Sequence, residues 1–112
     1  MAATLETASA NSMDELEEFV TSNRLVVADF FATWCKPCQS IKPYFSTLQA
    51  QYPGQIKFVL VDIDEAPDAA EDLGVETMPT FIFFKDGVEV SRCLGASQEK
   101  LGEAVNKFST EQ

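Results

Sequence analysis

Trp34-Cys35-Lys36-Pro37-Cys38 follows the apolar run 25–32, LVVADFFA. The run predicts a buried strand, and the residues from the cysteines to Gln51 predict a helix. The two thiols therefore lie where a strand is followed by a helix N-terminus. Free backbone N–H groups there stabilise a thiolate, the nucleophilic form of cysteine. A second thiol one helical turn further on can form a disulfide, so the stretch indicates a redox-active dithiol.

Length and charge limit the classes of protein that fit. A chain of 112 residues predicts a single domain over 1–112, and 46% apolar residues suit an ordinary globular core. The net charge is −10, with 18 acidic against 8 basic side chains. This balance disfavours nucleic acid and anionic membranes as partners, and we expect a monomer. No apolar stretch approaches the roughly 20 residues that a membrane-spanning helix needs.

The content of histidine and cysteine excludes several mechanisms. Histidine is absent, which removes Cys-His and Ser-His catalysis and most zinc sites. Three cysteines are an odd number, which argues for a reducing compartment rather than a secreted disulfide framework. The first twenty residues have neither a basic start nor an apolar stretch, so we expect a cytoplasmic protein. An organellar protein whose presequence had been removed would look the same.

The rest of the chain alternates between strand and helix patterns. In chain order we expect a weak strand at 3–7, a helix from the capping box 12–15 to about 21, a strand at 25–31, the helix with the cysteines to 51, a strand at 56–63, a short helix at 67–73, strands at 80–84 and 88–94 joined by an Asp-Gly turn, and a last helix capped by Ser97. The order βαβαβαββα predicts an α/β fold: a central mixed sheet of about five strands with helices on both faces.

At this point the chain resembles the thioredoxin family over about residues 3–109. The matching segments are Val27-Ala28-Asp29-Phe30, Ala32-Thr33-Trp34-Cys35-Lys36-Pro37-Cys38, Ile41-Lys42-Pro43, Val61-Asp62-Ile63-Asp64, Met78-Pro79-Thr80-Phe81, Phe84-Lys85-Asp86-Gly87 and Leu94-Gly95-Ala96. The resemblance implies the thioredoxin fold and reduction of protein disulfides with no bound cofactor beyond the Cys35–Cys38 disulfide. It also implies thioredoxin reductase as electron donor, and targets such as peroxiredoxins or reductases.

The resemblance assigns different roles to the two cysteines. Cys35 is expected to be the exposed nucleophile, and Cys38 the resolving thiol that releases the target. Asp29 is the only charge in an apolar strand, so burial should raise its pKa. The family makes it the proton acceptor and donor for Cys38, whereas the alternative is an aspartate merely hydrogen-bonded in the core. For the cysteines, the alternatives are two core thiols or half of a zinc site, which lacks further ligands.

The same resemblance predicts a surface that binds the target. Pro79 is expected to be a cis proline beside the cysteines, although the sequence alone also fits an ordinary proline at the start of a strand. Met78 would then offer its backbone to an extended target segment. The expected substrate groove is formed by Trp34, Lys36, Pro37, Val75, Met78, Leu94, Gly95 and Ala96.

Two positions depart from the family pattern, and two features lie outside it. Lys36 stands where the family usually has glycine, so we expect a slightly more oxidising couple. Leu60 stands where many relatives have Lys or Glu, which should raise the pKa of Asp29 further. Cys93 is expected to be a buried, inert thiol, with a regulatory thiol as the alternative. The acidic residues between 62 and 72 suggest a solvated face rather than a metal site.

Two other functions remain open on the sequence. One is a disulfide oxidase or isomerase, which would normally work in an oxidising compartment. The other is a binding subunit with a thioredoxin fold and an idle dithiol, because a fold does not prove a function.

Overall fold

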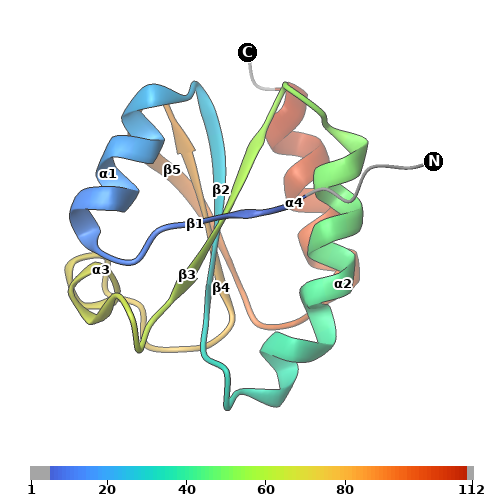
Figure 1. Ribbon diagram of the computed structural model, residues 1–112. Helices are drawn as coiled ribbons and strands as arrows, with labels where there is room; N and C mark the ends of the chain where they lie inside the picture. The colour runs from blue at the N-terminus through green and yellow to red at the C-terminus, as the bar shows by residue number, and fades with distance from the viewer. Residues whose placement is uncertain (1–5, 111–112) are drawn as a thin grey trace.

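A computed structural model describes residues 6–110 of the chain. Its centre is a five-stranded sheet in the order β1-β3-β2-β4-β5, and four helices pack on it (Figure 1). The elements are β1 (Ala8–Ser9), α1 (Met13–Ser22), β2 (Leu25–Phe31), α2 (Lys36–Gln51), β3 (Lys57–Asp62), α3 (Pro67–Asp72), β4 (Thr80–Lys85), β5 (Val88–Leu94) and α4 (Gln98–Thr110). The α/β class, the mixed sheet and the element order agree with the prediction from the sequence.

The helices cover both faces of the sheet, α1 and α3 on one face and α2 and α4 on the other (Figure 1). Side chains of β2 alternate between these two cores because successive residues of a strand point to opposite faces. Val26, Ala28 and Phe30 pack with α1 and α3, while Leu25 and Val27 pack with α2 and α4. All seven residues of β2 are buried, which explains its continuous apolar run.

Strand pairing brings the functional segments to one edge of the sheet. β2 pairs with β3 in parallel and with β4 antiparallel. The C-terminal end of β2 therefore lies beside the C-terminal end of β3 and the N-terminal end of β4, where Phe30 pairs with both Val61 and Thr80. The cysteines follow β2 directly, so this arrangement places them beside the loops that follow β3 and precede β4.

Local sequence signals set most element boundaries. Ser12 caps α1, because its hydroxyl accepts the Glu15 N–H at 3.1 Å. The β4–β5 hairpin turns at Asp86 and Gly87, whose φ angles of 52° and 83° suit a tight two-residue turn. Pro37 lies in the first turn of α2, and the helix continues past Pro43. No helix within residues 6–110 combines the length and apolar character needed to cross a bilayer.

The first strand differs from the prediction. Part of the expected strand, 3–5, lies outside the described residues, and Glu6 and Thr7 are not in a strand. The strand is instead Ala8–Ser9, which pairs in parallel with Val59 and Leu60 of β3. Ala and Ser have little preference for strands, so the pairing with β3 determines this element rather than local propensity.

Candidate active site: the Cys35–Cys38 dithiol

Cys35 and Cys38 form a disulfide at the start of α2. Cys35 is the N-cap of this helix, and its sulfur accepts the backbone N–H of Cys38 at 3.3 Å. A thiolate on Cys35 in the reduced protein would receive the same N–H group and the positive end of the helix dipole. The local sequence therefore builds a site that favours the ionised form of Cys35.

The cysteines differ in accessibility less than expected. Cys35 is 7% exposed and Cys38 is 1% exposed, so both are buried. The prediction of an exposed Cys35 is wrong in this disulfide state, although Cys35 remains the more accessible of the two. The reason is packing, because the disulfide lies in a small cluster with Phe31 and Ala32, and Met78 packs against it.

The loop before β4 lies against the disulfide. The sulfur of Cys35 is 3.9 Å from the carbonyl oxygen of Met78, and the Met78–Pro79 peptide bond is cis. Gly95 donates its N–H to the carbonyl oxygen of Pro79 at 2.9 Å. Residues from three distant parts of the sequence, 35, 78–79 and 95, thus form one continuous surface.

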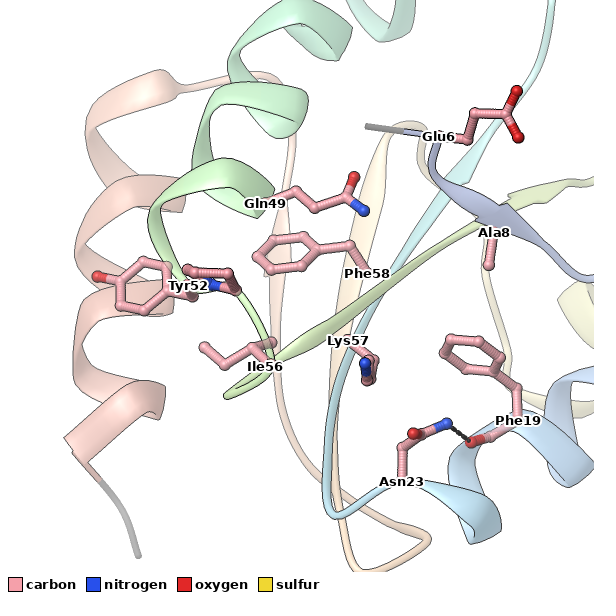
Figure 2. Close-up of a pocket in the computed structure, with 11 residues that line it drawn as sticks. Glu6, Ala8, Phe19, Asn23, Gln49, Tyr52, Ile56, Lys57 and Phe58 are labelled. Atoms are coloured by element: carbon pink, nitrogen blue, oxygen red, sulfur yellow. Dashed lines mark hydrogen bonds between the residues drawn. The ribbon is translucent and has the colours of Figure 1, made fainter. Parts of the chain in front are cut away.

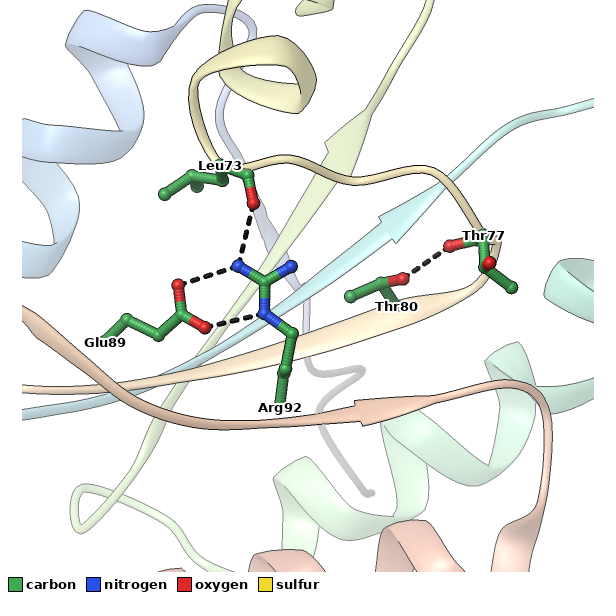
Figure 3. A network of polar contacts seen from close by, with 5 residues as sticks. All are labelled: Leu73, Thr77, Thr80, Glu89 and Arg92. Carbon is green, nitrogen blue, oxygen red and sulfur yellow. Dashed lines mark hydrogen bonds and ion pairs between the residues drawn. The ribbon is translucent and has the colours of Figure 1, made fainter.

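Polar contacts hold the segment that leads to Pro79 (Figure 3). Arg92 of β5 donates to the carbonyl oxygen of Leu73 at 2.8 Å, and it also forms an ion pair with Glu89 at 2.6 Å. The hydroxyl of Thr80 donates to the carbonyl oxygen of Thr77. These contacts attach both ends of the 73–80 segment to the sheet, so Met78 is presented from a supported loop.

Trp34 is the prominent exposed side chain next to the disulfide. It is 65% exposed, and its indole N–H donates to the Asp64 carboxylate at 3.0 Å. Asp64 is positioned in turn by its own N–H, which donates to the carboxylate of Asp62 at 2.9 Å. The sequence placed Asp64 in a solvated acidic face and gave no sign of this contact, because thirty residues separate the two partners.

The other predicted groove residues occupy two kinds of environment. Leu94 is 57% exposed, and Lys36, Pro37 and Ala96 are also exposed. Val75 is only partly buried and packs against the core formed by α1 and α3, not against the disulfide cluster. Exposed apolar side chains beside a redox pair are suited to contact a partner protein.

Asp29 is a buried acid in the middle of β2. It is 1% exposed, and neither of its carboxyl oxygens has a hydrogen-bond partner among residues 6–110. Burial raises the pKa of Asp29 to about 7, and the positive charge of Lys42 opposes this rise. The alternative of a core aspartate held by hydrogen bonds therefore does not describe this residue. A carboxyl group with such a pKa can both accept and donate a proton near neutral pH.

Cavities elsewhere do not coincide with the dithiol. One of about 470 Å³ lies at the N-terminal end of β3, where Phe58 and Lys57 meet the ends of α1 and α2 (Figure 2). This is the opposite end of the sheet from the cysteines.

Within the described part of the chain, no three Cys, Asp or Glu side chains lie close enough together to hold a metal ion. The Cys pair itself supplies the redox chemistry.

Cys93 is a free cysteine, and it is half-buried rather than fully buried. It packs against the core under α4, and burial raises the pKa of its thiol, with Lys100 acting in the opposite direction. A raised pKa lowers the thiolate fraction, so the environment of Cys93 favours the inert form.

Comparison with known proteins identifies one family across nearly the whole chain. Residues 6–107 match the family model described as Thioredoxin. A thioredoxin from Callithrix jacchus is 43% identical over 100 residues, which cover 88% of this chain and 94% of that protein. A Plasmodium falciparum thioredoxin structure has a TM-score of 0.88 at 33% identity and covers 91% of this chain and 99% of its own.

A third match comes from a study entitled "Structural basis of the thiol resolving mechanism in yeast mitochondrial 1-Cys peroxiredoxin via glutathione/thioredoxin systems". That structure has a TM-score of 0.87 at 31% identity and covers 95% of this chain and 99% of its own. The matched regions include the strand-helix junction with both cysteines. The chain belongs to the thioredoxin family and is a thiol-disulfide oxidoreductase of the protein-disulfide reductase type, with the Cys35–Cys38 pair as its redox-active group.

Proposed function

We propose that Cys35 is the attacking thiolate of this reductase and Cys38 the resolving thiol. The single observation that carries this assignment is the N–H of Cys38 directed at the sulfur of Cys35 at the start of α2. This contact favours negative charge on Cys35, and Cys38 lies deeper in the protein. The reverse assignment would require the more buried sulfur to approach the target first.

The reaction then proceeds in two exchanges. The Cys35 thiolate attacks one sulfur of the target disulfide, forms a mixed disulfide, and releases the other target sulfur as a thiolate that takes up a proton. Cys38 loses its proton and attacks the sulfur of Cys35. The bond between Cys35 and the target breaks, and the second target sulfur leaves and is protonated. The product is a reduced target and the Cys35–Cys38 disulfide seen here.

Asp29 is proposed to accept the proton of Cys38 in the second exchange and to return one when the dithiol is reduced again. Its pKa of about 7 supports this role, because such a group is partly ionised at neutral pH. Its position supports the role as well, since β2 leads directly to the dithiol and α2 packs on the face to which Asp29 points.

Target recognition is proposed to use backbone groups of Met78 beside cis Pro79, with Trp34 and Leu94 as apolar contacts. The carbonyl of Met78 already faces the sulfur of Cys35, so a segment paired with this backbone would bring its disulfide to the nucleophile. The exposure of Trp34 and Leu94 supports this docking surface. Lys36, Pro37, Gly95 and Ala96 would form its border.

The proposed electron donor is thioredoxin reductase, and the proposed targets include peroxiredoxins. Support for the targets comes from the structural match whose study concerns the thiol resolving mechanism of a yeast mitochondrial 1-Cys peroxiredoxin via glutathione/thioredoxin systems. We further propose that the protein works in the cytoplasm as a monomer. The odd number of cysteines supports a reducing compartment.

Turbidimetric reduction of insulin with dithiothreitol tests the assignment. We expect catalysis by the parent and by Cys93→Ser, and none by Cys35→Ser. The Cys38→Ser variant should accumulate a mixed disulfide with insulin, which non-reducing electrophoresis detects, because attack can occur without resolution. Accumulation of the mixed disulfide in Cys35→Ser instead would reverse the two roles. An inactive parent would favour the binding subunit with an idle dithiol.

A further inference from the structure

Asp29 has few neighbours that could control its ionisation. Its strand partners are Leu60 on β3 and Phe81 on β4, and neither titrates. Its neighbours on the same face of β2 are Val27 and Phe31, which are also apolar. The titratable side chains on the packed face of α2 are Cys38, which is in the disulfide, Lys42 and Tyr44, and of these only Lys42 carries a charge that acts on Asp29. In the oxidised protein, the charge that acts on Asp29 is therefore the ammonium group of Lys42.

The position of Lys42 follows from two contacts. Its nitrogen lies over the ring of Phe31 at 4.4 Å from the centroid, two residues from Asp29 on the same face of β2. Lys42 also lines a cavity of about 400 Å³ with Leu60, the β3 partner of Asp29. Phe31 and Leu60 are thus neighbours of both residues, so the half-buried lysine lies near the acid.

We propose that Lys42 is a positioning residue for proton transfer at Asp29, because its ammonium group, held over Phe31 from α2, stabilises the buried carboxylate. This inference rests on the proposed role of Asp29 in the reaction. Leu60 supplies no charge from β3, so the counter-charge comes from the helix that carries the cysteines.

The electrostatic balance at Asp29 supports the role of Lys42. Burial destabilises the carboxylate and raises its pKa, whereas the charge of Lys42 lowers it, and the net result is a pKa of about 7. Loss of Lys42 would leave burial unopposed. A smaller fraction of Asp29 would then be ionised at neutral pH, and fewer molecules could accept the proton of Cys38.

A direct titration of Asp29 tests the first part of the proposal. The ¹³C carboxyl signal of Asp29 is followed by NMR in the oxidised protein, with Asp29→Asn to identify it. We expect Lys42→Met to raise the pKa of Asp29 by about 0.5 to 1, since a nearby opposite charge stabilises the ionised form by this order in a partly solvated site. Methionine keeps an unbranched apolar side chain over Phe31. Lys42→Arg keeps the charge and should restore the parent value.

Lys107→Met is the matched control for the loss of one positive charge. Lys107 is exposed on α4 and is not among the charges that act on Asp29. Its replacement should leave the Asp29 titration unchanged. A titration of Lys42→Met that equals that of the parent would overturn the proposal, and so would an equal rise in Lys107→Met. A thermal unfolding curve for each variant shows whether the fold is retained.

The kinetic test separates this proposal from the role of Asp29 itself. Single-turnover release of the target from the mixed disulfide is measured between pH 5.5 and 9 for the parent, Lys42→Met, Asp29→Asn and the double variant. We expect the pH profile of Lys42→Met to move to higher pH than that of the parent, by the amount seen in the titration. In the Asp29→Asn background, adding Lys42→Met should not shift the profile. Identical profiles for the parent and Asp29→Asn would refute proton transfer by Asp29, while the titration would still decide whether Lys42 controls its pKa.

Discussion

Replacing Asp29 by asparagine should make the protein more stable at alkaline pH. The folded state holds this carboxyl group 1% exposed and without a hydrogen-bond partner among the described residues, whereas the unfolded chain exposes it to water. Ionisation is therefore much harder in the folded state than in the unfolded state. Asparagine has nearly the same shape and never ionises, so it removes the pH-dependent part of this cost.

The magnitude follows from the two pKa values. The pKa of Asp29 is about 7 in the folded protein against a reference value of 3.8. Between these values the unfolded chain releases a proton that the folded protein keeps, so rising pH favours unfolding. The stability contribution is complete below pH 3.8 and is lost as pH rises through 7. One pH unit corresponds to about 1.4 kcal/mol, so the full loss is about 4 kcal/mol, of which about 3 kcal/mol falls between pH 5 and 8.5.

The assay is urea unfolding of the oxidised protein, followed by circular dichroism at pH 5 and at pH 8.5. Both proteins should carry Cys93→Ser so that no free thiol exchanges with the disulfide in the unfolded chain. We expect the stability of Asp29→Asn relative to the parent to rise by about 3 kcal/mol from the lower to the higher pH.

Asp72→Asn is the control for this experiment, because it makes the same chemical change at an exposed position. Its difference from the parent should change by less than about 0.5 kcal/mol between the two pH values. If Asp29→Asn also kept a constant difference from the parent, the pKa of Asp29 would not change on folding, and the argument for an acid poised at neutral pH would be lost.

Three further predictions concern the site and the core. Lys36→Gly should lower the reduction potential of the Cys35–Cys38 couple by about 10 mV, because it removes a solvent-screened cation that favours the thiolate. Equilibration with a glutathione buffer measures the potential, and a variant potential equal to or above that of the parent would contradict the prediction. Asp64→Ala should raise KM for insulin by about three- to tenfold, because it removes the hydrogen-bond acceptor of the Trp34 indole. Asp64→Asn keeps an acceptor oxygen at this position and should change KM less. Phe83→Ala should lower the free energy of unfolding, measured in urea, by about 3 to 5 kcal/mol. The ring of Phe83 is 0% exposed and packs edge-to-face on Phe108, so its removal leaves a cavity in the core. A loss below about 1 kcal/mol would show that the core closes around the gap.

The fold could be predicted closely where the sequence carries local signals. A continuous apolar run predicted β2 at 25–31, and an Asp-Gly pair predicted the hairpin between β4 and β5. Capping and turn residues act over three or four positions, so they are visible in the chain itself. The first strand was misplaced because its position depends on pairing with β3, which no local pattern encodes.

The candidate site also has parts that the sequence reveals and parts that only the fold reveals. The cysteines and Asp29 could be identified from their types and spacing, because a dithiol at a helix start and a lone acid in an apolar strand are unusual. The contacts from Asp64 to Trp34 and from Arg92 to Leu73 could not, since the partners lie thirty and nineteen residues apart and the fold alone brings them together. The same holds for Lys42 over Phe31, which only the packing of α2 on β2 reveals.

The cost in stability and the chemistry proposed for Asp29 have one origin. A carboxyl group with a hydrogen-bonded partner in the core would ionise readily and would hold its proton too weakly to return it near neutral pH. A fully isolated one would stay protonated and could not accept the proton of Cys38. Lys42 keeps the pKa of Asp29 between these two extremes, because its charge lowers the cost of ionising the carboxyl group without a hydrogen bond to it. Substitutions that stabilise the fold at Asp29 should therefore slow resolution, and combining Asp29→Asn with Lys42→Met should add little further loss of rate, since the lysine acts through the acid that is already gone.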